Sequence, residues 1–499
     1  MKSFALLCTL LLAACALHAA ERNIVFFIAD DMGAFLGCYG TKQAKTPHMD
    51  ALAEDGTLFT RAHATTASCS ASRSVIMTGL HNHLNGQYGH SHSFHKFGLF
   101  PNTVTLALPQ VMRLAGYRTG LFGKNHVSPS SVIDYDVEKK EKSRNTVQLV
   151  DSAMEFITAG DERPFIAYIG ASDPHRDGRT DEASPYKPNM FGNLPAGKSF
   201  PGLGETFYKP EDVFVPPFLP DTPTCRAELV NYYQSVSRVD AGLGHLVRRL
   251  KEAGLYDKTL IIMTSDHGMA FPGGKTTVYE PGLHVPLIVR NPYAAKRGIR
   301  NNALVSHVDL TPTMLDFAGG LDAAKNAPKK IVDAAAWAKA KGYGKEDNLG
   351  KKHNKYHGRS WLGIMEQEGD PTRDTLYASH TFHEIQMYYP MRVIRDEKFK
   401  LIWNIAHGLP YPFASDLWAA PAWQAQWKQG KDAMYGFRTV DQYIHRPAFE
   451  LYDMKYDPDE RKNLAADPAH KATLEEYKAR LKKFQEEMND PWVQKWEYE

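Results

Sequence analysis

Two pairs of side chains that could bind a metal ion each follow a short apolar run. Asp30 and Asp31 come directly after the first run, and Asp266 and His267 come directly after the second. A single Asp pair after a strand is more often a turn or a helix cap. The second pair, which again begins with Asp, favours a metal site, because these four groups together could hold one divalent cation. An oxygen-dominated set of ligands suits Ca²⁺ or Mg²⁺.

A cysteine stands where a nucleophile could be activated. Cys69 precedes a helix-like run, and Arg73 follows it one helical turn later. A lone cysteine usually behaves as a small buried hydrophobe. Here the N-terminus of a helix and a guanidinium group would support an anionic nucleophile.

Further basic side chains follow two other apolar runs. Lys124 and His126 come after one of them, and His175 comes after the other. The chain also holds a dense group of five histidines, whose spacing fits no closed zinc site, so we expect one or two of them to line the wall of a pocket. These are His81, His83, His90, His92 and His95.

The elements that position these groups alternate between strand and helix. Short β-branched and aromatic runs predict buried parallel strands, and longer amphipathic stretches predict helices between them. The pattern predicts an α/β fold with a large, mostly parallel sheet flanked by helices on both faces, and a ligand crevice beyond the carboxyl ends of the strands. The predicted strands are 23–29, 118–122, 164–170 and 259–265, and the predicted helices are 103–115, 146–158 and 227–253.

The rest of the chain predicts a second, smaller domain. We expect a catalytic domain over 21–360, ending in an Ala/Lys/Gly-rich insertion or linker at 319–357. The domain at 361–499 should hold a small antiparallel sheet and a packing helix. Its predicted strands are 375–378, 391–394, 398–403 and 449–452, and its predicted helix is 472–488.

The first 20 residues have the form of a signal peptide. Two processing sites compete: a lipobox ending at Cys15, which would leave a lipid anchor, and an ordinary cleavage site after Ala20. Both predict an exported protein, periplasmic or secreted, and the first predicts a membrane-anchored lipoprotein. No later stretch is apolar enough for a membrane span.

Charge and cysteine content exclude other classes. The 499 residues include 59 Lys+Arg and 57 Asp+Glu, a formal net charge of +2, which argues against a nucleic-acid partner. Five cysteines are too few for a disulfide scaffold. The sequence leaves open whether Cys38 pairs with Cys225, and it leaves the oligomeric state open, with a homodimer among the possibilities.

The segment Cys69-Ser70-Ala71-Ser72-Arg73, with Thr78-Gly79 after it, resembles the signature of the type I, or formylglycine, sulfatases of the alkaline phosphatase superfamily. The resemblance extends over nearly the whole chain and includes motifs at 29–31, 46–52, 123–126, 173–175, 264–268, 450–453, 457–458 and 463–464. It implies the alkaline-phosphatase-like sulfatase fold and the hydrolysis of sulfate esters or sulfamates.

The resemblance also implies roles for the candidate residues. Cys69 would become formylglycine through a maturation enzyme, and the hydrated aldehyde would attack sulfur and later expel sulfate. One cation, Ca²⁺ by family precedent, would be held by Asp30, Asp31, residue 69, Asp266 and His267. Arg73 and Lys124 would stabilise the nucleophile. His126 would act as the base that releases sulfate, while His175 and Lys275 would bind the sulfonate and protonate the leaving group.

Other stretches are similar to the sulfamidase branch of the family, at 85–89, 123–127, 173–176, 271–276, 389–392 and 490–493. This branch removes the N-sulfate of glucosamine at the non-reducing end of heparan sulfate or heparin fragments, so a sulfated glycosaminoglycan fragment is the expected partner. The candidate substrate-binding residues are His95, Arg176, His383 and Glu384. His267 stands where Asn is common, Lys275 where Arg is common, and the 319–357 insertion looks long.

Three alternatives remain at the level of sequence. The first is an O-sulfatase acting at the end of another sulfated glycan. The second is a phosphodiesterase or phosphonate hydrolase of the same superfamily, which the single-cation ligand set disfavours. The third is an inactive, glycan-binding lipoprotein, which the complete set of expected catalytic residues disfavours.

Overall fold

The computed structural model describes residues 22–498 except 93, 101–105, 131, 141–143, 178–188, 196 and 321–355. The expected signal peptide with Cys15, and nearly all of the expected insertion at 319–357, lie outside the described residues. Among the helices that are described, none combines the length and apolar character needed to cross a bilayer.

An eight-stranded sheet forms the centre of the molecule, in the order β4-β3-β5-β1-β6-β7-β2-β8. The pairings are parallel except those of β7, which runs antiparallel to both β6 and β2. The mostly parallel sheet is therefore confirmed, and the four predicted strands are β1, β3, β5 and β6. The strands are β1 (Asn23–Ala29), β2 (Thr57–His63), β3 (Arg118–Gly123), β4 (Val137–Lys139), β5 (Phe165–Gly170), β6 (Thr259–Ser265), β7 (Leu287–Arg290) and β8 (Ile299–Ser306).

The sheet carries a hydrophobic core on each face. Along β1, Val25 and Phe27 belong to one core, whereas Phe26 and Ile28 belong to the other. Because successive side chains of a strand point to opposite faces, a strand buried on both sides is apolar throughout. This explains the unbroken apolar runs in the sequence.

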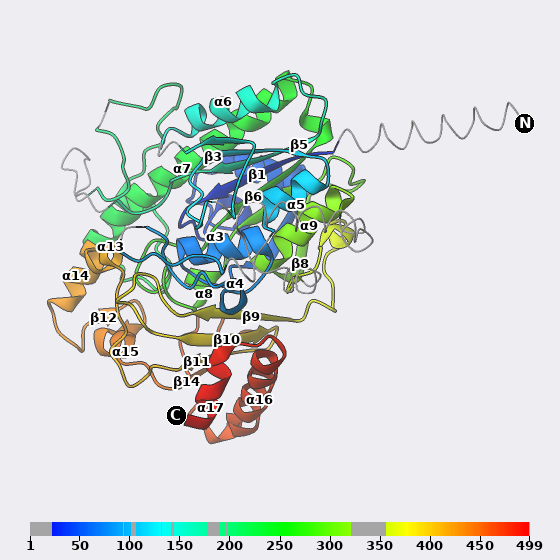
Figure 1. Ribbon diagram of the computed structural model, residues 1–499. Coiled ribbons are helices and arrows are strands. Elements are labelled where there is room, and N and C mark those ends of the chain that lie inside the picture. Colours follow the sequence, from blue (N-terminus) through cyan, green and yellow to red (C-terminus); the bar gives the residue numbers. More distant parts are fainter. Residues whose placement is uncertain are drawn as a thin grey trace, which may run out of the picture.

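Helices cover both faces, as expected. Helices α6 and α7 lie over one face, and α3, α5 and α9 lie over the other (Figure 1). The helices of this part are α2 (Pro47–Glu54), α3 (Cys69–Thr78), α4 (Asn82–Asn85), α5 (Leu108–Leu114), α6 (Thr146–Ile157), α7 (Pro223–Glu252), α8 (Glu280–Leu283) and α9 (Leu310–Phe317).

The longest helix begins one turn earlier than predicted. Helix α7 starts at Pro223, and the side chain of Thr222 caps it by accepting a hydrogen bond from the backbone N–H of Cys225. Proline is well tolerated at the first position of a helix, where its missing N–H costs nothing. Part of the predicted helix 103–115 lies outside the described residues, and α5 forms the described part.

A second sheet of four antiparallel strands lies beside the first, in the order β14-β11-β10-β9. Helix α16 packs against it through Tyr477 and Leu481, in a core shared with Leu401 and Leu451. The predicted antiparallel sheet and packing helix are thus present. The elements are β9 (Thr375–His380), β10 (Met391–Asp396), β11 (Phe399–Asn404), α13 (Ser415–Trp418), α14 (Pro421–Trp427), β12 (Met434–Tyr435), β13 (Arg438–Thr439), α15 (Val440–Ile444), β14 (Phe449–Asp453), α16 (Lys471–Glu487) and α17 (Lys495–Tyr498).

The described cysteines form no disulfide: Cys38, Cys69 and Cys225 are all free thiols. The question of a Cys38–Cys225 pair is therefore answered, since both side chains are unpaired.

Candidate active site

The candidate nucleophile and the candidate metal ligands meet where β1 and β6 end. Four side chains, those of Asp31, Cys69, Asp266 and His267, are buried and place ligand atoms within 4.8 Å of one another. The Sγ atom of Cys69, the first residue of α3, lies 3.3 Å from Nε2 of His267 and 3.5 Å from Oδ1 of Asp31. The parallel strands thus bring together residues that are nearly 240 positions apart.

The backbone around this centre adopts rare conformations. Asp31, His126 and Thr276 have φ values of 68°, 64° and 66°, in the left-handed region that non-glycine residues seldom occupy. The backbone N–H of Asp31 donates to Oδ1 of Asp266, 3.0 Å away, which holds the two strand ends together. Such conformations persist where the surroundings fix them, and they concentrate at functional sites.

His267 is oriented for metal binding. Its Nδ1 lies 3.1 Å from the backbone carbonyl oxygen of Gly268, which can only accept a hydrogen bond. Nδ1 therefore carries a proton, and Nε2 lies 3.0 Å from Oδ1 of Asp31. Although burial works against protonation, Asp266 and Asp31 raise the pKa of His267 well above its usual value, so Nε2 would release its proton when a cation binds. Hydrogen bonds of this kind fix the tautomer of metal-binding histidines.

The charges of the four groups fit a bound cation. Burial disfavours the charged form of Asp31, yet Lys275, His175 and His267 hold the pKa of its carboxyl well below the usual range. Burial raises the pKa of Asp266, although Arg73 opposes this effect. Two buried carboxylates, one imidazole and the side chain at position 69 form a compact set that a divalent cation would neutralise.

Asp30 lies outside this compact set. Its carboxylate is paired with Nζ of Lys124 and with the guanidinium of Arg73, 3.4 Å away. Although burial works against its ionisation, Lys124 and His175 lower the pKa of Asp30 far below its ordinary value. Asp30 therefore balances the charges of Lys124 and Arg73.

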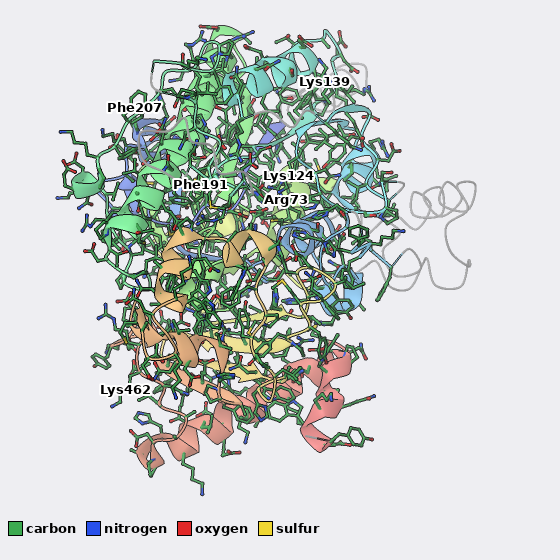
Figure 2. All side chains as sticks on the ribbon, turned by 90° about the vertical axis from the view of Figure 1, so that its left-hand side faces the viewer. Arg73, Lys124, Lys139, Phe191, Phe207 and Lys462 are labelled. Carbon is green, nitrogen blue, oxygen red and sulfur yellow. The ribbon has the colours of Figure 1, made fainter. Side chains whose placement is uncertain are left out.

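Arg73 ties the nucleophile helix to three strand ends. Its Nε donates to Asp266 at 2.9 Å, and its Nη1 donates to the hydroxyl of Tyr168 at 2.9 Å and to the carbonyl of Lys124 at 3.0 Å. The side chain is fully buried. Figure 2 labels Arg73 and Lys124, which lie next to each other.

A second cluster lies on the other side of Asp31. Nζ of Lys275 lies 2.9 Å from Oδ2 of Asp31, 3.2 Å from Nε2 of His175 and 2.9 Å from Oδ2 of Asp416. Burial and the nearby Lys275 lower the pKa of His175 to about 4. His175 is neutral above that pH and accepts a hydrogen bond from Lys275, so its other ring nitrogen carries the proton.

His126 lies against the predicted histidine group. Its ring stacks on His90 and His92, with centroids 4.8 and 5.2 Å away. Nitrogen atoms of these three rings lie within 4.8 Å of one another, which could suggest a second metal site. However, the ring of His90 is already bonded on both sides, with Nδ1 3.3 Å from Ser70 Oγ and Nε2 2.8 Å from His383 Nε2. His90 is thus tied to Ser70, next to the candidate nucleophile, and to His383.

The structure brings three of the four predicted substrate-binding residues together. Besides its contact with His90, His383 bonds Ser68, which precedes the nucleophile. Glu384 accepts a hydrogen bond from Ser415 at 2.8 Å, and Nδ1 of His95 accepts one from the backbone of Ile385 at 3.0 Å. The loop after β9 thus reaches the site from the small sheet.

Arg176, the fourth, does not face this region, and its prediction as a substrate contact is wrong. The side chain is 1% exposed and packs against Phe191 and Phe271. Its guanidinium pairs with Glu228 of α7 and donates to the carbonyl of Ala270 at 2.9 Å. A buried pair of this kind holds elements together and keeps the guanidinium away from a ligand in the site.

Sequence reasoning missed two residues of the site. Tyr168 lies inside a strand, where an aromatic residue looks like ordinary core. Asp416 lies in a one-turn helix, 141 positions from its partner Lys275. Neither has a local signal that could have identified it.

Comparison with known proteins gives relatives over almost the full length. A family model described as sulfatase matches residues 22–320. Human N-sulphoglucosamine sulphohydrolase is 36% identical, over 97% of this chain and 94% of its own. An N-acetylglucosamine-6-O-sulfatase of Bacteroides thetaiotaomicron is 24% identical over 97% of this chain and 90% of its own.

Solved structures share the fold. One protein, solved with its substrate D-glucosamine-2-N,6-O-disulfate, matches with a TM-score of 0.63 and 21% identity, covering 94% of this chain and 98% of its own. A phosphonate monoester hydrolase from Silicibacter pomeroyi matches with a TM-score of 0.61 and 20% identity, covering 93% and 95%.

Proposed function

Because this chain belongs to the sulfatase family, we propose that it removes the N-sulfate group of glucosamine at the non-reducing end of heparan sulfate or heparin fragments. The observation that carries the proposal is the 36% identity over 97% of the chain to an enzyme named for this substrate. The neighbouring structure with a bound glucosamine N,O-disulfate supports the same substrate class.

The residues near position 69 suit attack on an anionic group. A sulfamate is negatively charged, so a nucleophile can approach its sulfur only where positive charge is fixed in advance. Lys124 and Lys275 stand on two sides of the centre, and Arg73 backs the nucleophile helix. The family generally uses a formylglycine and a divalent metal ion, and the formylglycine, here derived from Cys69, supplies the attacking oxygen.

Asp31, Asp266, His267 and the side chain at position 69 would hold the ion, which we propose is Ca²⁺. The bound ion polarises the sulfonate oxygens. Asp30 was expected as a further ligand. While it remains paired with Arg73 and Lys124, it would position these two cations beside the ion and would not bind the ion itself. Recovery of activity in chelator-treated protein with Ca²⁺, and not with Mg²⁺, tests the identity of the ion.

Proton transfer would fall to the two histidines and Lys275. Burial and Lys124 hold the pKa of His126 well below its usual value, so the ring is neutral and can accept a proton. Its buried Nδ1 has no hydrogen-bond partner within the described residues, which leaves that atom available as the base. Lys275 keeps its proton, shares it with His175, and can deliver it to the leaving nitrogen.

This function requires a maturation enzyme in the host, and we propose that the protein is exported to meet its polymeric substrate outside the cytoplasm. Mass spectrometry of the peptide that contains Cys69, from protein made in its native host, tests the maturation. An unmodified thiol in all molecules would overturn it.

Rates on three substrates test the specificity. We expect faster hydrolysis of N-sulfoglucosamine than of glucosamine-6-sulfate or an aryl sulfate. Faster hydrolysis of glucosamine-6-sulfate would instead support an O-sulfatase, the activity for which the Bacteroides relative is named.

A further inference from the structure

Asp416 places a negative charge inside a site that must bind an anion. It belongs to α13, which lies at the level of α3 and beside α14 (Figure 1). Its carboxylate is 15% exposed. One oxygen lies 2.9 Å from Nζ of Lys275, and the other accepts a hydrogen bond from the backbone of Leu417 at 3.0 Å.

The contacts around Lys275 give the direction in which Asp416 lies. Asp31 turns Oδ1 toward Cys69 and His267, and turns Oδ2 toward Lys275. Asp416 is the next group beyond Lys275. Asp31, His175 and Asp416 place ligand atoms within 4.8 Å of one another around Lys275, and Asp416 is not a member of the set of four around position 69. Asp416 therefore lies on the Lys275 side of Asp31.

The leaving group is expected in that direction. In an in-line displacement, the leaving atom departs on the side of sulfur opposite the attacking oxygen. His175, whose ring nitrogen lies within 4.8 Å of ligand atoms of Asp31 and Asp416, is 30% exposed and opens this side to solvent. Asp416 thus stands beside the expected position of the leaving atom.

The charge of Asp416 needs a cationic partner besides Lys275. Asp31 and Asp266 are compensated by the cation that their set would bind, whereas Asp416 lies outside that set. Lys275 pairs with Asp416, but the same positive charge is needed to bind the sulfonate of the substrate. A further carboxylate weakens the binding of sulfate unless it interacts with something positive.

A sulfamate supplies this positive charge, and a sulfate ester does not. Protonation of the sulfamate nitrogen by the Lys275–His175 pair places positive charge on that nitrogen before the S–N bond breaks. The bonding pair then stays on nitrogen, which leaves as a neutral amine while sulfur bonds to the attacking oxygen. The released amine takes a second proton from water and becomes the product ammonium. An ester gives a neutral hydroxyl at the same point.

We propose that Asp416 is a specificity-determining residue, which accepts a charge-assisted hydrogen bond from the leaving amine and so favours N-sulfate over O-sulfate. This inference rests on the proposed function. The structure also allows a purely positioning role, in which Asp416 only holds Lys275 in place. The two roles differ in their consequences, because Lys275 would bind the sulfonate of every substrate.

The isosteric variant Asp416→Asn separates the two roles. We expect kcat/KM for N-sulfoglucosamine to fall about 10- to 100-fold, the equivalent of one charge-assisted hydrogen bond. For glucosamine-6-sulfate or an aryl sulfate we expect a smaller loss, so that the ratio of kcat/KM for the sulfamate to kcat/KM for the ester falls by about tenfold. Asp416→Glu should recover part of the preference. The control is Asp441→Asn, a matched change at an exposed carboxylate whose hydrogen bond is to His445.

A binding measurement tests the amine contact without turnover. Calorimetry at pH 6, where an amine is protonated, compares glucosamine with the neutral N-acetylglucosamine. We expect Asp416→Asn to weaken only the binding of glucosamine, by about tenfold. Equal losses of kcat/KM on sulfamate and ester would show that Asp416 only positions Lys275, and unchanged glucosamine binding would overturn the inference. Failure of the wild-type protein on N-sulfoglucosamine would instead overturn the proposed function.

Discussion

At the scale of single residues, Arg73 holds the site together. Its planar guanidinium joins Asp266, Asp30 and the hydroxyl of Tyr168, so that one buried side chain fixes the nucleophile helix relative to the strand ends. The sequence could predict a cation one turn after Cys69. It could not predict Tyr168, because this residue lies inside a buried apolar strand. Nothing in the pattern of such a strand shows that the tyrosine hydroxyl accepts a hydrogen bond from a charged side chain.

Replacement of Arg73 should therefore reduce stability as well as activity. We expect Arg73→Met to lower the free energy of unfolding by about 3–5 kcal/mol, because it leaves buried carboxylates unpaired. Arg73→Lys should lower the free energy of unfolding by less, because lysine keeps the positive charge although it lacks the planar set of N–H donors of the guanidinium. Urea denaturation measures both. Arg461→Met, at an exposed arginine paired with Asp459, is the control and should have little effect; an equally small loss for Arg73→Met would contradict this account.

At the scale of elements, the site residues that the sequence could predict are those that directly follow strands. Asp31, Lys124 and Asp266 follow apolar runs, and parallel topology places such strand ends at one edge. Four strands of the large sheet, β2, β4, β7 and β8, were not predicted. Strand β8 contains a polar Arg-Asn-Asn stretch, and β7 runs antiparallel to both of its neighbours. Helix α13 is only one turn long, and long-range pairing alone positions it.

The ion pair of Arg176 and Glu228 connects the loop after β5 to helix α7. Glu228 of α7 also accepts a hydrogen bond from the backbone N–H of Ala422, at the start of α14, at 2.6 Å. We expect Glu228→Gln and Arg176→Met each to destabilise the fold by about 3–5 kcal/mol, because each leaves a buried partner charge unpaired.

The double variant should lose less than the sum of the two single changes, because the residues interact directly. Thermal or urea unfolding gives the three values. The KM of the folded Arg176→Met protein should stay near that of the wild type, and a large rise in KM without loss of stability would restore Arg176 as a substrate contact.

At the scale of the whole molecule, two buried histidines and one half-buried histidine pack against helix α16 of the C-terminal part. The rings of His81, His83 and His357 stack on one another, and Phe484 of α16 packs edge-on against the first two. Burial lowers the pKa of His83 to about 4 and that of His357 to about 4, with Asp490 and Arg392 exerting opposite effects on His83. These rings are neutral in the folded protein at neutral pH.

Stability should therefore fall in mild acid. In the unfolded chain these histidines take up protons near pH 6.5, whereas the folded state takes them up only near pH 4. The contribution of these neutral histidines to the free energy of unfolding is fully present above pH 6.5, and it is lost as the pH falls toward 4. We expect the slope of unfolding free energy against pH in this range to decrease by up to about 1.4 kcal/mol per pH unit in His357→Asn.

Asparagine can still accept the hydrogen bond that His357 receives from the backbone of His81. The exposed His407→Asn variant is the control. A slope that is unchanged in His357→Asn would show that the stacked histidines do not carry this pH dependence.

The central claim is that a nucleophile derived from Cys69 cleaves the bond between nitrogen and sulfur. Its most direct test is a time course of matured wild-type protein and Cys69→Ala on N-sulfoglucosamine, with sulfate and free glucosamine amine both quantified. The account predicts equal amounts of the two products from the wild type and none from Cys69→Ala. Sulfate release by Cys69→Ala at the wild-type rate, or no release of glucosamine by the matured wild type, would contradict it.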